Sequence, residues 1–299
     1  TIGEEKAQNP LLRERDRGQR LACKHSQRGA VRARDSGNRA DVAFAETGTL
    51  PYLARKHGPA EVAITIRATR LPTGVVPAAR SAHALAVIRR AYPAVEDCGD
   101  ALSGALMNAG PVIHPPLIMM NAAPLQHFPA WDIHNEGTQP AVRSVTDQLD
   151  AERIAVREAL GYGAPHFPLA DHYNNDQWMY GDAHKKLVDS GDWREKIDLH
   201  SHRYMREDTA MGLALLVSVG RHAGVDTPVA ARLLAMAGAV VGEDLARGAR
   251  TLDGLGLGGL GDREAGPPVG GGQPGRLQRL EPVLAQPVQR RPAGHRRQQ

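Results

Sequence analysis

The hydrophobic pattern of this chain changes near residues 97–100, and this change most constrains the fold. Before it, the segment EVAITI (Glu61–Ile66) is the β-branched, apolar run of a short buried strand. Residues 78–93 then have the spacing of a helix closed by a proline. After the change, every patterned segment has the helical period. The chain therefore predicts an α/β portion over residues 41–97 and a helical domain over 98–260.

Three segments carry the helical pattern of the second domain. The first, residues 144–161, has four apolar side chains on one face and a glycine at its end, namely Val145, Leu149, Val156, Leu160 and Gly161. The second, residues 207–224, is nearly all apolar after an acidic first turn, so we expect it to be buried. The third begins with Asp226 or Thr227 as N-cap and has Pro228 in its first turn.

The two ends differ from the middle. Residues 1–40 show neither the helical nor the alternating period, and residues 261–299 are rich in Gly, Pro and Arg, a composition typical of disorder. The first residue is Thr, and Arg, Gly, Pro and Ala are what a GC-rich gene yields when it is read out of frame. We therefore hypothesise that one or both ends are out-of-frame or truncated translation.

The positive charge of the chain belongs to these ends. Residues 1–40 have a net charge of +5 and residues 262–299 a net charge of +4, whereas the whole chain is only +4, which leaves −5 for residues 41–261. A mildly acidic body makes nucleic-acid binding improbable. The sequence contains neither a membrane-spanning apolar run nor a signal-peptide pattern, and Cys23 and Cys98 form no metal-binding spacing. We expect a cytoplasmic protein.

One glycine motif is misleading. Gly256–Gly261 reads GLGGLG, a formal match to the dinucleotide-binding fingerprint. That fingerprint needs a strand before it and a helix after it, whose first N–H groups bind a pyrophosphate. Here a helical region precedes the glycines and a Gly/Pro-rich segment follows them, so we do not assign a nucleotide site to them.

Two stretches carry candidate chemistry. His114 stands among apolar residues and prolines in NAGPVIHPPLIMMN (Asn108–Asn121), where a buried structural histidine is the simplest interpretation. HRYMRED (His202–Asp208) places two arginines and two carboxylates before the apolar helix, where acids also complement the helix dipole. A carboxylate at this position can instead accept the Nδ1–H of an imidazole and fix its tautomer. An arginine one turn earlier suits a carboxylate ligand.

These two stretches, together with DAERIAVREALG, GEDLARGARTLDGLGL and the upstream AETGTLPYLAR, resemble the octopine/nopaline (opine) dehydrogenase family. The resemblance runs from about Ala45 to about Leu260 and is greatest to bacterial enzymes that make N-(1-carboxyethyl) amino acids. It implies a Rossmann-type domain followed by a helical domain, with the active site in the cleft between them. It also allows a homodimer.

The resemblance implies an NAD- or NADP-dependent oxidoreductase that acts on CH–NH donors. Such enzymes condense an amino acid with a 2-oxo acid and reduce the imine. On the matching positions, His114 is the proton shuttle, Asp208 orients it, and Arg203 holds a substrate carboxylate. Asn108 is expected near the nicotinamide and Glu46 near the amino-acid substrate.

Other histidines receive no such role. His200 and His202 lack a third ligand at a metal-binding spacing, so we expect no metal. We expect His127, His134, His166 and His172 to be solvated loop residues.

Only the last part of a Rossmann-type domain precedes the helices, without a glycine-rich fingerprint, so we expect this chain to bind NADH weakly or not at all. Two alternatives remain: a hydroxy-acid dehydrogenase with the same helical domain, and a non-catalytic helical fragment that serves as a scaffold. The sequence does not specify the amino acid, the oxo acid, the choice between NAD and NADP, or the product stereochemistry.

Overall fold

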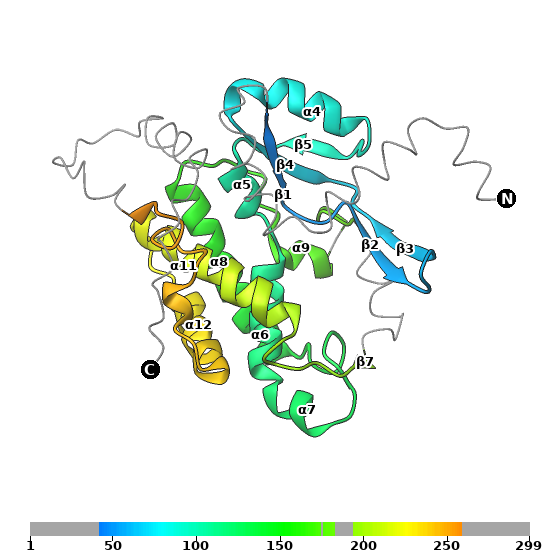
Figure 1. Cartoon of the computed structure of the whole chain (residues 1–299), viewed down its shortest axis with the longest axis vertical. Helices are drawn as coiled ribbons and strands as arrows, with labels where there is room; N and C mark the ends of the chain where they lie inside the picture. The colour runs from blue at the N-terminus through cyan, green and yellow to red at the C-terminus, as the bar shows by residue number, and fades with distance from the viewer. Residues whose placement is uncertain (1–41, 175, 183–193, 259–299) are drawn as a thin grey trace, which may run out of the picture. The chain divides into compact units, whose positions relative to one another are not determined.

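The computed structural model describes residues 42–174, 176–182 and 194–258, and from Ala43 onward these belong to one compact unit. The predictions for residues 1–40 and 261–299 lie outside the described residues. Figure 1 shows the order of the elements. They are β1 (Phe44–Thr47), β2 (Tyr52–Lys56), β3 (Val62–Arg67), β4 (Leu71–Val76), η1 (Ala78–Arg80), α4 (Ser81–Arg89), β5 (Val95–Asp97), α5 (Ala101–Ala105), α6 (Gly110–Met120), α7 (Ala122–His127), β6 (Trp131–Asp132), α8 (Pro140–Ala159), α9 (Leu169–Asn174), β7 (Arg194–Glu195), η2 (Tyr204–Leu213), α11 (Ala214–Ala223), α12 (Pro228–Val241) and η3 (Leu245–Arg247).

The α/β portion is a three-stranded sheet in the order β1-β4-β5. β4 pairs antiparallel with β1 and parallel with β5, and α4 is the crossover between the two parallel strands. Every residue of β4 is buried, because α4 and α5 both pack against this strand. Leu71, Val75, Leu85 and Val95 form the small core under α4.

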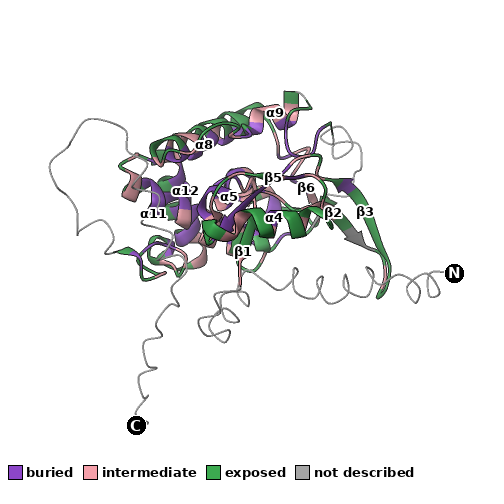
Figure 2. Ribbon diagram, turned by 90° about the horizontal axis from the view of Figure 1, so that it is seen from above, coloured by how far each residue is buried: buried purple, intermediate pink, exposed green. Residues whose placement is uncertain are grey.

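The segment EVAITI forms strand β3, but the prediction that it is buried is wrong. β3 pairs with β2 in a separate two-stranded antiparallel ribbon, and only Ile66 is buried. Val62 and Ile64 are exposed, and Figure 2 shows most of this ribbon in the colour of exposed residues. The ribbon is separate from the larger sheet, and its two faces are not both covered by other elements. Its apolar side chains Val62 and Ile64 therefore stay in contact with solvent.

The helical portion packs α6, α8, η2, α11 and α12 around one core. Leu149 and Val156 of α8 and Leu213 of η2 are completely buried. The predicted face of α8 is confirmed, although the helix begins at Pro140, four residues before the predicted start. The amphipathic pattern identified the buried face correctly because only that face meets the other helices.

The start of α12 is also where the sequence placed it, with Thr227 as N-cap and Pro228 in the first turn. The Thr227 side chain makes no capping hydrogen bond, so the backbone N–H groups at the start of α12 need another acceptor. The Glu152 carboxylate on α8 instead accepts hydrogen bonds from the backbone N–H groups of Val229 and Ala230, at 2.7 and 2.9 Å. One carboxylate therefore caps α12 and fixes it against α8.

Helix α6 contains the sequence around His114, including Pro115 and Pro116 inside the helix. Proline has no backbone N–H, so the carbonyls of Pro111 and Val112 lose the partners four residues later that a regular helix would provide. The helix forms despite this loss because both prolines and most of their neighbours are buried in the core.

Candidate active site

Asp208 lies in a π-helix rather than in the first turn of an α-helix. η2 is a π-helical segment that begins at Tyr204 and continues directly into α11, so the acidic residues lie one turn further inside than predicted. The Thr209 hydroxyl, completely buried, donates to the carbonyl of Tyr204 at 2.8 Å, five residues back. π-Helical turns are rare and occur often at functional sites. This one brings Arg203, Glu207 and Asp208 to one cleft wall.

Two glycines allow α6 and η2 to approach closely. A Cβ atom on Gly212 would lie 2.3 Å from Cγ of Pro111, and a Cβ atom on Gly110 would lie 2.2 Å from Oδ1 of Asp208. Both distances are far below van der Waals contact. The absence of a side chain at these positions therefore lets the Asp208 carboxylate reach the N-terminal turn of α6.

The structure brings His114 and Asp208 together. Nδ1 of His114 lies 2.8 Å from Oδ2 of Asp208, and the side chains are only 15% and 16% exposed. An ionised carboxylate only accepts hydrogen bonds, so the pairing places the proton on Nδ1. Among the described residues, none hydrogen-bonds Nε2 of His114. This second ring nitrogen is thus available to a reactant.

His114 lies at the wall of a cleft of about 630 Å³. All five residues that the sequence singled out line this cleft: Glu46, Asn108, His114, Arg203 and Asp208. They come from both portions of the chain, since Glu46 lies on β1 and the others lie on or beside α6 and η2. Aromatic and apolar side chains form much of the remaining wall, including Leu50, Ile113, Tyr173, Trp178 and Tyr180.

Asn108 and Glu46 differ in their surroundings. Oδ1 of Asn108 accepts the backbone N–H of Gly110 at 3.0 Å, so this side chain holds the first turn of α6 while it lines the cleft. Glu46 remains open to solvent, yet the protein mass around it raises the pKa of its carboxyl above the ordinary value. The positive charge of Arg250 opposes this shift. The Glu46 carboxyl is thus a weaker acid than a solvated glutamate.

Two of the histidines that were predicted to be solvated lie in the site instead, so the prediction is wrong for them. His172 is buried in α9 against Trp178, with ring centroids 4.6 Å apart. Nε2 of His134 lies 3.0 Å from the hydroxyl of Tyr204. Both histidines line the cleft. Tyr204 lies 70 residues from His134 in the sequence, so no local spacing could have indicated that contact.

His166 is also only partly solvated, whereas His127 is exposed as predicted. The Arg157 guanidinium donates to Nδ1 of His166 at 3.3 Å. Burial, followed by the charge of Arg157, lowers the pKa of His166 below the ordinary histidine value. His166 therefore helps to hold the residues next to the cleft and does not line the cleft itself.

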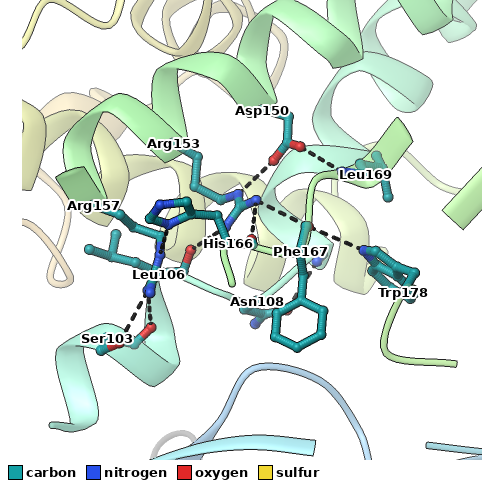
Figure 3. A network of polar contacts seen from close by, with 11 residues as sticks. Ser103, Leu106, Asn108, Asp150, Arg153, Arg157, His166, Phe167, Leu169 and Trp178 are labelled. Carbon is teal, nitrogen blue, oxygen red and sulfur yellow. Dashed lines mark hydrogen bonds and ion pairs between the residues drawn. The ribbon is translucent and has the colours of Figure 1, made fainter. Parts of the chain in front are cut away.

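Buried arginines on α8 support the loops next to the cleft (Figure 3). Arg153 pairs with Asp150 at 2.6 Å and donates to the carbonyls of Leu106, His166 and Phe167. Arg157 donates to the carbonyl and the hydroxyl of Ser103. Burial, together with the nearby charge of Arg153, lowers the pKa of Arg157 to about 10. These bonds fix the segment that leads through Asn108 into α6.

The described residues contain no group of three or more His, Cys, Asp or Glu side chains that could hold a metal ion. His200 is exposed and its backbone N–H bonds to Asp198, at a turn before η2. Of the glycines of GLGGLG that the structure describes, Gly256 lies in a turn and Gly258 in a 3₁₀ conformation, with no strand leading into Gly256. No helix in the described part of the chain is long and apolar enough to cross a membrane.

The fold resembles solved structures of opine-forming enzymes. Octopine dehydrogenase solved with NADH and L-arginine matches 77% of this chain and 67% of its own, with a TM-score of 0.53 and 17% identity. Yersinopine dehydrogenase solved with NADP⁺ matches 79% of this chain and 69% of its own, with a TM-score of 0.52 and 14% identity. At these identities the likeness concerns the fold. It confirms the predicted class, an α/β portion followed by a helical dehydrogenase domain.

Sequence comparison finds two curated relatives. The chain is 27% identical over 227 residues to the opine dehydrogenase of Arthrobacter sp. (strain 1C), covering 74% of this chain and 62% of that protein. It is 28% identical over 174 residues to the vitopine synthase of Allorhizobium ampelinum, covering 54% of this chain and 45% of that protein. The chain thus spans less than two thirds of the length of these curated relatives.

Residues 97–241 match the family model described as NAD/NADP octopine/nopaline dehydrogenase, alpha-helical domain. This range contains α6, α8, η2, α11 and α12, and with them His114, Arg203 and Asp208. The resemblance expected from the sequence is confirmed: the helical portion of this chain is similar to the alpha-helical domain of the octopine/nopaline dehydrogenase family.

Proposed function

We propose that the protein is an opine dehydrogenase-type oxidoreductase. In the proposed reaction, the amine of an amino acid condenses with a 2-oxo acid and loses water, and NAD(P)H with one proton reduces the imine to a secondary amine. The observation that carries the proposal is the 2.8 Å contact between His114 and Asp208 at the wall of a cleft that also contains Arg203.

Each proposed role follows from the chemistry of the side chain. His114 exchanges the proton of the reacting nitrogen at Nε2, because Nδ1 is held by Asp208. Asp208 keeps the imidazole oriented and stabilises its cationic form. Arg203 offers a planar guanidinium to a substrate carboxylate. Glu46, across the cleft on β1, accepts a hydrogen bond from the amino group of the amino acid.

The cleft also fits the reacting end of a nicotinamide cofactor. Glu46 of β1, which is exposed, lines this cleft, and Asn108 offers it a polar side chain. When bound there, the reduced cofactor supplies a hydride. The sequence contains no glycine-rich strand–turn–helix, so we assign the pyrophosphate of the cofactor to no residue of this chain.

The proposal predicts NADH or NADPH consumption that requires both an amino acid and a 2-oxo acid. Since the chain is expected to bind NADH weakly, the assay uses the highest cofactor concentration that absorbance allows, and a fluorescence titration measures the affinity itself. Consumption with the 2-oxo acid alone would favour the hydroxy-acid dehydrogenase alternative. No consumption with any pair, while NADH binds, would favour the non-catalytic helical scaffold.

A substitution at Gly110 tests the geometry of the site. In Gly110→Ala, the new Cβ atom displaces the Asp208 carboxylate from Nδ1 of His114, since the two cannot occupy the same space. We expect kcat to fall by roughly ten- to hundredfold, the cost of misplacing a reacting group by about an ångström. The melting temperature should change little, because the atom that must move is at the end of a flexible side chain.

Gly163→Ala is the matched control, because a Cβ atom at Gly163 meets nothing within 4 Å. It should leave both the rate and the melting temperature as they are. A Gly110→Ala enzyme with the full wild-type rate would show that the His114–Asp208 contact does not serve catalysis.

A further inference from the structure

Tyr204 lines the cleft together with His114 and Arg203, although the sequence gave it no role. Its ring is stacked on the imidazole of His114, with centroids 3.6 Å apart and planes inclined by 10°. The Arg203 guanidinium lies 5.0 Å from the centroid of the same ring, and the His202 ring is nearly perpendicular to it, with centroids 4.4 Å apart. The hydroxyl of Tyr204 is 3.0 Å from Nε2 of His134.

The contact between His114 and Asp208 cannot by itself fix the imidazole. A single hydrogen bond sets the direction of Nδ1 but lets the ring pivot about the line between Nδ1 and Oδ2. That pivot would swing Nε2 away from a reactant. The stacked ring of Tyr204 blocks the pivot, because tilting the imidazole would drive it into a neighbour that is only 1% exposed and held by the core.

Tyr204 itself is held at three points. It begins the π-helix, its carbonyl accepts the buried hydroxyl of Thr209, and its own hydroxyl pairs with His134. A buried ring of this kind has almost no surface with which to touch a substrate. Any effect of Tyr204 on the reaction must therefore pass through the groups stacked on it.

We propose that Tyr204 is a positioning residue: its ring fixes the plane of the His114 imidazole, and the bond between its hydroxyl and His134 fixes the ring of Tyr204. This inference rests on the proposed function, in which His114 exchanges the proton of the reacting nitrogen. It adds a second constraint on that histidine, independent of Asp208. It also gives His134 a structural task at the site.

Proton and ¹⁵N spectra of the histidine side chains test the stacking without a cofactor. The carbon-bound ring protons of His114, assigned by their loss in His114→Gln, should lie upfield because they face the ring of Tyr204. Tyr204→Phe keeps the ring and should keep the upfield shift. Tyr204→Leu removes the ring and should abolish it. The ¹⁵N signals should also move from an Nδ1–H tautomer toward a mixture of tautomers.

Kinetics test the consequence. Tyr204→Leu should lower kcat by roughly ten- to hundredfold with little change in the KM for the amino acid, the signature of a misplaced reacting group. Tyr204→Phe should lose much less. Tyr162→Leu is the control for general loosening, since Tyr162 is a partly buried tyrosine bonded to Asp100 outside the cleft. It should leave the His114 signals unchanged.

Unchanged His114 spectra in Tyr204→Leu would overturn the inference, as would an equal change in Tyr162→Leu. A loss of the upfield shift in Tyr204→Phe as large as in Tyr204→Leu would also overturn it, because the hydroxyl and not the ring would then set the plane. A wild-type chain that consumes no NADH contradicts the proposed function instead, and the spectra still decide whether Tyr204 orients His114.

Discussion

Replacing His114 by alanine is expected to lower the rate of NADH consumption, with both co-substrates present, by roughly 10²- to 10⁴-fold, the usual contribution of a general acid–base group. The substitution removes the one side chain that the structure holds, through Asp208, with a ring nitrogen available to the reactant. Initial rates at saturating amino acid and 2-oxo acid measure the loss in kcat. The affinity for the amino acid, measured by calorimetry, should change much less.

His127→Ala is the matched control for this substitution. His127 is an exposed histidine at the end of α7, and it does not line the cleft. Its removal should leave the rate unchanged. Should His114→Ala retain the wild-type rate, the acid–base role of His114 would be excluded. The alternative that the chain is a non-catalytic helical scaffold would then be favoured.

The largest effect on stability is expected from Arg153→Met, which should lower the free energy of unfolding by about 3–5 kcal/mol. The substitution leaves the Asp150 carboxylate buried and without its cationic partner, with only the backbone N–H of Leu169 still bonded to it. It also removes the donors that satisfy the carbonyls of Leu106 and Phe167. Urea denaturation followed by circular dichroism measures the loss.

Two further variants separate the buried charge from general effects. Arg232→Met changes an exposed arginine on α12 and should alter the stability by no more than about 0.5 kcal/mol. The double variant Asp150→Asn with Arg153→Met should recover part of the loss, because no charge then remains buried without a partner. A loss of less than 1 kcal/mol in Arg153→Met would show that the arginine network does not stabilise the fold.

The sequence by itself determined the local elements and the family resemblance. The helical period gave the buried face of α8, and the Thr227–Pro228 pair gave the start of α12. The blocks around His114 and the Arg203–Asp208 segment indicated the resemblance to the family and five of the residues that line the cleft. These features depend on neighbouring residues or on short motifs, so they can be read without knowing which distant segments meet.

The tertiary structure decided everything that depends on contacts between distant segments. EVAITI has the composition of a buried strand, yet it is exposed because, within the part of the chain that the structure describes, it pairs with β2 alone. His134 looks like a loop histidine, yet it lines the cleft, where Tyr204 from a segment 70 residues away meets it.

The π-helix and the stacking of Tyr204 on His114 likewise arise where η2 packs against α6. Hydrophobic periodicity reports how much of a residue faces the interior. It does not report which side chain from another segment will lie beside it, and that choice sets the chemistry of the site.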